Sequence, residues 1–320
     1  MKITEHISTA QSKKKTLFSF EVLPPKKGEH MDNLINAIDP LMEFEPAFID
    51  VTYHREEYVY RKLPDGTTKK VTTKKRPGTV GICAALQNKY KIDAVPHIIC
   101  GGFSKEETEN ALIDLNFLGI DNVLALRGDQ IKSESSFVPE PDGNAYATDL
   151  IEQVQQMNIG KYLDDELDNS TKTDFCIGAA CYPEKHFEAE SLDSDMKYLK
   201  QKIELGAEYL ITQMFFDNQK FFDFVKQCRA EGITVPIIPG LKPLATVKQL
   251  DILPSIFFID MPEELRSNVL AASSKEEVKE IGIQWSIQQC KELIDFGSPV
   301  LHFYTMSKST ATQKIARAVF

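Results

Sequence analysis

The chain alternates between short apolar runs and longer segments whose apolar residues recur at helical spacing. The apolar runs predict strands at 16–22, 47–53, 94–100, 122–126, 175–181, 208–213, 235–240 and 299–305. Helices are predicted at 31–44, 79–90, 104–118, 146–157, 191–205 and 219–231, in three pieces over 245–294 that break near Pro254 and Pro262, and after the last strand. Eight strands that alternate with helices favour one closed (β/α)8 barrel, the TIM barrel of the α/β class, with residues 1–320 as a single domain.

One segment interrupts this alternation after the second predicted strand. Between Glu56 and Arg76 the sequence is basic and rich in β-branched residues on both sides of Pro64-Asp65-Gly66, which is typical of a β-hairpin. The fold is therefore expected to carry a basic hairpin insertion. Its lysines suit either a phosphate-binding patch or a solvated edge, and exposed lysine on a projecting strand more commonly has the second role.

Composition and charge narrow the function classes. With 320 residues, 42% of them hydrophobic, the chain can bury a large core. A net charge of -10 argues against a nucleic-acid partner, because phosphate contacts need a surplus of Lys and Arg. The six cysteines form no C-x-x-C pair and are expected to be reduced and structural. No apolar stretch is long enough to span a membrane and the N-terminal segment is polar, so a soluble, cytoplasmic protein is expected.

Candidate chemistry lies at the ends of the predicted strands. The strand at 122–126 runs into Arg127-Gly128-Asp129, and the carboxyl ends of parallel strands meet at the ligand in such folds. Arg127 and Asp129 would then face a ligand, and Gly128 would let the backbone approach it. Taken alone, the tripeptide suits a solvated turn equally well. Glu21, near the end of the first strand, makes the candidate acid/base pair with Asp129.

Other kinds of site find little support in the sequence. His97, His186 and Cys181 lack the spacing of a metal site, so no metal is expected. The chain has no Gly-rich dinucleotide fingerprint, P-loop or G-x-S-x-G elbow, so a dinucleotide would have to be held by barrel loops. A glycosidase would need several Trp residues to stack on sugar, and Trp285 is the single Trp of the chain.

Seven ordered motifs along nearly the whole chain resemble those of the methylenetetrahydrofolate reductase family, in its stand-alone bacterial form. The motifs are Phe18–Lys26, Ala94–His97, Leu126–Asp129, Tyr182–His186, Ile211–Asp217, Ile238–Gly240 and His302–Thr305. The resemblance implies a barrel enzyme with non-covalent FAD. NADH or NADPH would reduce the flavin and leave, and 5,10-methylenetetrahydrofolate would then take the same site to become 5-methyltetrahydrofolate, which feeds methionine synthesis. The resemblance also implies a homo-oligomer.

The resemblance further implies roles for single residues. Glu21 matches the general acid that protonates the folate so that its methylene bridge opens to an iminium. Asp129 matches the aspartate near flavin and pterin, and Gln213 the glutamine that touches either substrate. Gln249 and Lys308 join Asp129 and Gln213 as substrate-binding positions. The FAD contacts fall on Thr52, Tyr53, His97, Arg127, Gly128, Asp129, Ala147, Tyr182, His186, Ala189, Asp195 and Lys202.

The chain departs from the family pattern at a few positions, and two other functions stay open. Lys308 stands where the family commonly has an arginine, which replaces a bidentate fork by a point charge. Leu253 stands where an aromatic residue is expected against the substrates, and His54 and Arg55 lead into the hairpin. The alternatives are a zinc-dependent methyltransferase on the same barrel and a non-catalytic relative that binds folate or flavin.

Overall fold

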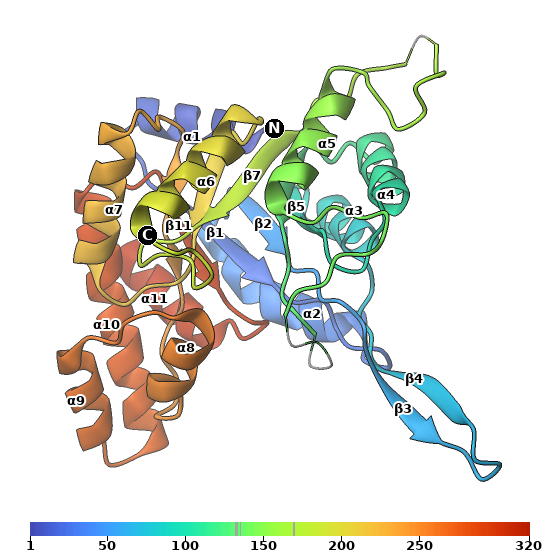
Figure 1. The fold of residues 1–320 in the computed structure, drawn as a ribbon. Helices are drawn as coiled ribbons and strands as arrows, with labels where there is room; N and C mark the ends of the chain where they lie inside the picture. The colour runs from blue at the N-terminus through green and yellow to red at the C-terminus, as the bar shows by residue number, and fades with distance from the viewer. Residues whose placement is uncertain (132–133, 135, 169) are drawn as a thin grey trace.

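The computed structural model describes residues 1–131, 134, 136–168 and 170–320, and these form a ring of parallel strands surrounded by helices (Figure 1). The strands of the ring are β1 (Leu17–Val22), β2 (Phe48–Val51), β5 (Asp93–Ile99), β6 (Asn122–Leu126), β7 (Cys176–Cys181), β8 (Tyr209–Thr212), β9 (Ile237–Ile238), β10 (Gly240–Leu241) and β11 (Val300–Tyr304). They pair in parallel in the order β10-β11-β1-β2-β5-β6-β7-β8-β9. The predicted (β/α)8 barrel is confirmed.

The ring closes at its seventh strand position, which Pro239 divides into β9 and β10. β9 pairs with β8, whereas β10 pairs with β11, so the two pieces face opposite neighbours. The carbonyl of Pro239 accepts a hydrogen bond from the His302 N–H at 3.1 Å, and the Gly240 N–H donates to Thr212 Oγ1 at 2.9 Å. A Cβ at Gly240 would lie 2.4 Å from the Thr212 carbonyl oxygen, so glycine is required for this close approach.

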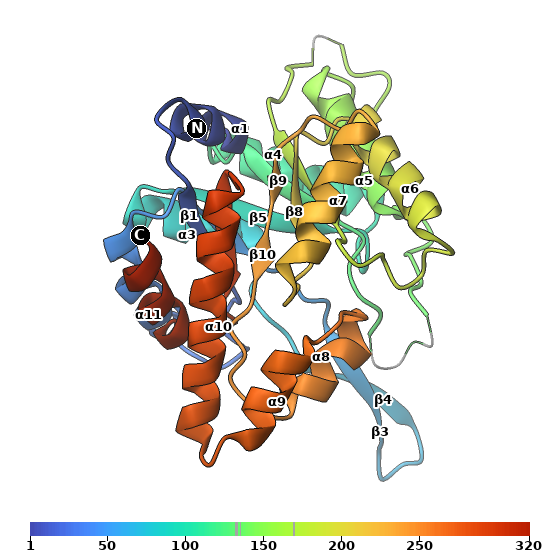
Figure 2. The ribbon, with the colours of Figure 1, turned by 90° about the vertical axis from the view of Figure 1, so that its left-hand side faces the viewer.

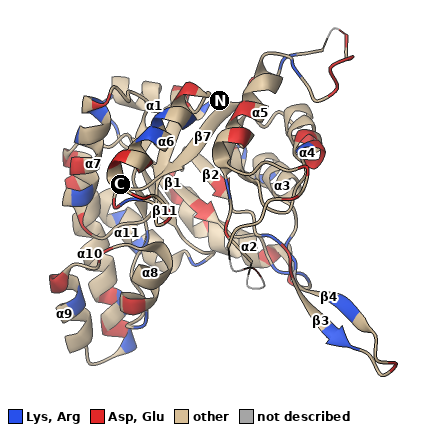
Figure 3. Ribbon diagram, in the orientation of Figure 1, with Lys and Arg blue, Asp and Glu red and all other residues tan. Residues whose placement is uncertain are grey.

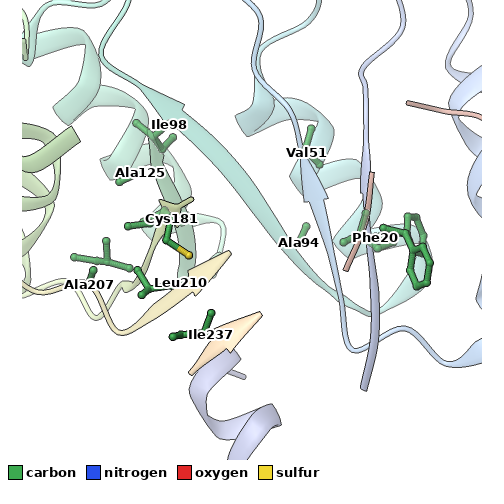
Figure 4. Close-up of a cluster of buried hydrophobic side chains, with 14 of the residues drawn as sticks. Phe20, Val51, Ala94, Ile98, Ala125, Cys181, Ala207, Leu210 and Ile237 are labelled. Atoms are coloured by element: carbon green, nitrogen blue, oxygen red, sulfur yellow. The ribbon is translucent and has the colours of Figure 1, made fainter. Parts of the chain in front are cut away.

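Helices follow the strands and cover the outside of the ring. They are α2 (Met31–Ile38), α3 (Thr79–Tyr90), α4 (Lys105–Phe117), α5 (Ala147–Asn158), α6 (Leu192–Glu204), α7 (Asn218–Ala230), α10 (Lys275–Asp295) and α11 (Thr310–Val319). Outward-facing strand residues such as Ile98, Ala125 and Leu210 form the main core with the helices (Figure 4). Strands buried on both faces explain why the sequence shows continuous apolar runs rather than strict alternation.

The inside of the barrel has its own core, and a helix that the sequence analysis did not predict closes one end of it. α1 (Ile3–Ser12) buries Ile3, Ile7 and Ala10 along one face. Ile3 and Ile7 pack with inward-facing strand residues such as Phe48 and Leu124. α1 lies at one end of the barrel, and the insertion hairpin with α8 (Gln249–Phe257) and α9 (Glu263–Ala271) lies at the other (Figure 2).

Two helical predictions need correction, both at prolines. The helix expected over 31–44 is α2 followed by a 3-10 helix, η1 (Asp39–Phe44), because Pro40 has no N–H to continue the α-helical ladder. The break expected near Pro254 is wrong, since α8 runs through that residue. The Leu250 carbonyl, which Pro254 cannot bond, lies 3.5 Å from Nη1 of Arg266 instead. α9 begins after Pro262 as predicted.

The predicted hairpin is confirmed and forms a separate two-stranded sheet. β3 (Glu57–Lys62) and β4 (Thr68–Lys74) pair antiparallel and project away from the barrel (Figure 1). Lys and Arg residues occupy both strands (Figure 3). The ammonium group of Lys70 lies 3.8 Å from the ring centroid of Tyr58, so part of the positive charge packs on the hairpin's own aromatic surface.

Candidate active site

The predicted site residues come from loops and strand ends at one end of the barrel. Glu21 lies near the end of β1, Asp129 follows β6, and Gln213 directly follows β8. Because parallel strands all point the same way, these residues reach the same end of the ring. This is the end that carries the hairpin and α8, opposite to α1 (Figure 2).

The first cluster joins β1, β2 and β5. Nε2 of His97 lies 3.7 Å from Oε2 of Glu21 and 3.4 Å from Oδ2 of Asp50. All three side chains are buried, and neither oxygen of Asp50 has a hydrogen-bond partner. Burial opposes a charge on His97, but the two carboxylates raise the pKa of His97 above its usual value.

A second cluster joins β7 and α6. The Lys202 ammonium donates to the Ala180 carbonyl at 2.9 Å and lies 5.8 Å from the centroid of the Tyr182 ring. The rings of Tyr182 and His186 meet edge to face at 4.6 Å, and the His186 N–H donates to Oδ2 of Asp195 at 2.8 Å. Burial lowers the pKa of Lys202. Burial also lowers the pKa of His186, and the nearby positive charges lower it further. Ala189 donates its N–H to the His186 carbonyl, so its backbone belongs to this loop.

The segment Arg127–Asp129 lies between the two clusters. Arg127 forms an ion pair with Glu188, and its guanidinium lies 4.9 Å from the centroid of the Phe137 ring. Gly128 has a φ of +83°, a conformation that glycine adopts readily. The Asp129 carboxylate adds to the effect of burial in raising the pKa of Tyr182. The strand end that the sequence singled out thus faces the second cluster.

Gln213 borders a small pocket with Tyr182, Glu184 and Phe257. Glu184 is nearly buried there, and one of its oxygens accepts the Asp260 N–H at 2.8 Å. Burial raises the pKa of Glu184 to about 7. The loop after β7 is therefore joined to the segment between α8 and α9, next to Gln213.

Three further residues that the sequence analysis singled out, Gln249, Lys308 and Leu253, lie in or near α8 or the loop after β10. The Gln249 amide oxygen accepts the N–H groups of Ala245 and Thr246 at 2.7 and 2.9 Å, so it is engaged with the loop that leads into α8. Lys308 contributes to lowering the pKa of Lys242, a residue just after β10, and thus lies near it. Leu253 is buried in the core under α8.

Three predicted flavin contacts lie near β2 and α5. The Thr52 N–H donates to the Val22 carbonyl, the Tyr53 ring packs at 5.0 Å against Phe103, and Ala147 is the first residue of α5. Within the described residues, no group of three His, Cys, Asp or Glu side chains is arranged to hold a metal ion. None of the helices there is long and apolar enough to cross a bilayer.

A family model described as methylenetetrahydrofolate reductase matches residues 3–319. The chain belongs to the methylenetetrahydrofolate reductase family. A probable methylenetetrahydrofolate reductase (NADH) of rice, Oryza sativa subsp. japonica, is 33% identical over 96% of this chain and 48% of its own length. The chain thus spans about half the length of such relatives. The 5,10-methylenetetrahydrofolate reductase of Escherichia coli is 28% identical, over 94% of this chain and 90% of its own.

A solved structure supports the fold. A protein from Clostridium thermocellum, described as binding two copies of 5-methyl-5,6,7,8-tetrahydrofolic acid, superposes with a TM-score of 0.59. The two chains are 16% identical, and the superposition covers 98% of each. At this identity the likeness establishes the shared barrel.

In this member of the methylenetetrahydrofolate reductase family, the sequence analysis did not place Asp50 or Lys242 near the site, and it assigned no role to Glu184. Asp50 is a charged residue inside an apolar strand that is buried on both faces, and such a charge needs a partner or a function. That was the signal available for Asp50. Glu184 lies inside the quoted Tyr182–His186 motif, but its burial depends on the α8–α9 segment and could not be read from the motif.

Proposed function

We propose that this protein reduces 5,10-methylenetetrahydrofolate to 5-methyltetrahydrofolate, with NADH or NADPH as the electron source and FAD as the cofactor. The observation that carries the proposal is the buried Glu21 carboxyl at the carboxyl end of β1, in contact with His97. Family membership and relatives named for NADH and for NADPH agree with it.

The second cluster fits the phosphate and ribose end of FAD. His186 and Lys202 lie against the Tyr182 ring, and the positive charge of Arg127 also acts on it, in a chain whose net charge is -10. Such donors suit phosphate oxygens, and Asp195 suits a ribose hydroxyl. Gly128 and Ala189 offer backbone without bulky side chains beside them. FAD bound there would accept a hydride from the nicotinamide and later deliver it to the folate.

The chain's own residues have distinct tasks in folate reduction. Glu21, if protonated, donates its proton to a pterin nitrogen, which allows the methylene bridge to open to an iminium that accepts hydride. Asp129 accepts hydrogen bonds from the pterin amine, and its negative charge would make a flavin held beside it a better hydride donor. Gln213 offers an amide donor and acceptor to either substrate. Lys308 provides a positive charge for an anionic part of the folate, while Gln249 orders the loop that leads into α8.

The Glu21→Gln variant tests the proposal. The amide is nearly the same size as the carboxyl but cannot deliver the proton, so the variant should keep FAD and its anaerobic bleaching by NADH. Reoxidation of the reduced flavin by methylenetetrahydrofolate, followed at the flavin absorption band, should be slowed by about 100-fold or more.

Wild-type protein supplies the reference for this test. It should be yellow, bleach with NADH or NADPH and recover its colour with the folate. If the Glu21→Gln variant reduced the folate at the wild-type rate, the role of Glu21 would be contradicted. A protein that takes up no FAD would contradict the proposed reaction altogether.

A further inference from the structure

Asp50 is a fully buried carboxylate whose place in the fold calls for an explanation. It lies on β2, in the interior of the barrel, with no exposed surface, and neither oxygen accepts a hydrogen bond. A buried ionised carboxylate is costly without a partner. The nearest opposite charge available to it is on His97, whose Nε2 lies 3.4 Å from Oδ2 of Asp50.

His97 has two carboxylates on the same nitrogen. Its Nε2 faces Asp50 and also Glu21, whose Oε2 lies 3.7 Å away. Asp50 is the nearer and is fully buried, whereas Glu21 keeps slight exposure towards the site. One imidazolium proton on Nε2 cannot serve both carboxylates fully, so the two compete for it.

The other titratable and charged groups around this pair do not replace Asp50. His302 on β11 is a neutral partner: its Nδ1 is 2.9 Å from Ser19 Oγ, and burial lowers its pKa. Burial also lowers the pKa of Lys242 and of His54. The other titratable groups that interact with Asp50, Glu21 or His97 from the packed elements are Cys83, Tyr209, His302, Tyr304, Lys242 and His54.

We propose that Asp50 is a positioning residue: it serves as the counter-ion of His97, so that Glu21 is left free to keep the proton it donates. This inference rests on the proposed function for its role in turnover, although the pairing itself does not. In folate reduction the O–H bond of Glu21 breaks, an N–H bond forms on the pterin, and the Glu21 carboxylate then regains a proton from water.

Two physical effects act in the same direction. With Asp50 in place, its negative charge disfavours a second negative charge on Glu21 nearby. Without Asp50, Glu21 would be the carboxylate left facing the imidazolium, and the pair would hold Glu21 ionised. An ionised Glu21 has no proton to donate, so the loss of a residue that does not touch the substrate would impair protonation of the folate.

The pairing can be measured on flavin-free protein by following the His97 ring resonances against pH by NMR. In Asp50→Asn, which keeps the shape of the side chain, the His97 midpoint should fall by about one pH unit. In Glu21→Gln it should fall less, because Asp50 remains. An unchanged midpoint in Asp50→Asn, or a larger fall in Glu21→Gln, would overturn the assignment. If Asp50→Asn does not fold, a Glu21→Gln midpoint below the usual 6.5 decides against it.

Asp93→Asn provides a matched control. Asp93 begins β5 at the opposite end of the barrel and contacts another histidine, His6, at 2.7 Å. This variant removes another Asp–His pair, a partly exposed one, without approaching the site. It should leave the His97 midpoint unchanged, and a shift equal to that of Asp50→Asn would show a general effect of lost charge and overturn the assignment.

The role in turnover has its own measurement. The rate of flavin reoxidation by methylenetetrahydrofolate is measured against pH, and at the upper end of the profile it should be about tenfold lower in Asp50→Asn than in wild type. Flavin reduction by NADH should be unchanged. An identical pH profile would overturn the role of Asp50. If wild-type protein does not reduce the folate at all, the proposed function fails, while the NMR result on the pairing still stands.

Discussion

Replacing Ile7 by Ala tests whether α1 is an integral part of the barrel. Ile7 is 1% exposed and packs with Ile3 against the inward-facing strand residues. The substitution removes three carbon atoms, a loss of about 2.4 kcal/mol in transfer free energy at about 0.8 kcal/mol per methylene. The cavity left between a helix and a closed ring can collapse only in part, so the total should be about 3–4 kcal/mol.

Urea unfolding of the flavin-free protein, followed by Trp285 fluorescence and by circular dichroism, measures this loss. Trp285 lies in α10 and its indole N–H donates to the Phe216 carbonyl, so its fluorescence reports on the packing of α10 against the segment after β8. Ser8→Ala, an exposed change on the same helix, should stay within about 0.5 kcal/mol of wild type. A loss below about 1 kcal/mol for Ile7→Ala would refute the view that α1 closes the barrel. FAD binding by the folded variant should be unchanged, because α1 lies at the end opposite the site.

Two further predictions concern stability. The Glu184→Gln variant should have a free energy of unfolding about 1–3 kcal/mol above that of wild type at pH 8 and equal to it at pH 4, as measured by urea unfolding. The reason is that the pKa of Glu184, about 7 in the folded state, lies above the unfolded value near 4.3. The wild-type protein therefore loses stability as the pH rises from the unfolded to the folded pKa. A constant difference at both pH values would contradict this. Gly282→Ala should lower the free energy of unfolding by about 3 kcal/mol, because the new Cβ would lie 1.9 Å from the Leu244 carbonyl oxygen. Gly81→Ala, whose Cβ would have open space around it, should raise the free energy of unfolding by about 0.5–1 kcal/mol. Equal melting temperatures for the two glycine variants would refute the packing argument.

The barrel could be predicted because its strands are buried on both faces, which makes each one a compact apolar run. α1 could not be predicted in the same way, because Ile3, Ile7 and Ala10 are spread among polar residues and their burial depends on the open end of the ring. The helix break predicted near Pro254 was wrong for a related reason. Its missing N–H normally ends a helix, and here a side chain from α9, that of Arg266, approaches the carbonyl left free.

Within the candidate site, the position of a residue relative to a strand end was a better predictor of its place in the site than its residue type. Glu21 and Asp129 could be found because each stands at or near the end of an apolar run, which in a parallel barrel means the site end. Asp50 could not be assigned a role from its position, because its significance depends on the distance to His97 across two strands. Gln249 was selected by resemblance, and its amide oxygen is engaged within its own loop.

Among the described residues, two histidine side chains pair with an aspartate carboxylate, and the difference between these pairs follows from where they lie. At the α1 end, Asp93 is partly exposed and completes its hydrogen bonds with His6 and the N-terminal amine, at 2.7 and 2.9 Å. At the site end, Asp50 is fully buried and leaves both oxygens without a hydrogen bond. A fold under selection for stability alone would favour the first arrangement at both ends. The lack of hydrogen bonds to Asp50 is therefore best explained by the proposed proton transfer from Glu21. If other groups hydrogen-bonded Asp50 fully, His97 would be free to pair with Glu21, the proton donor.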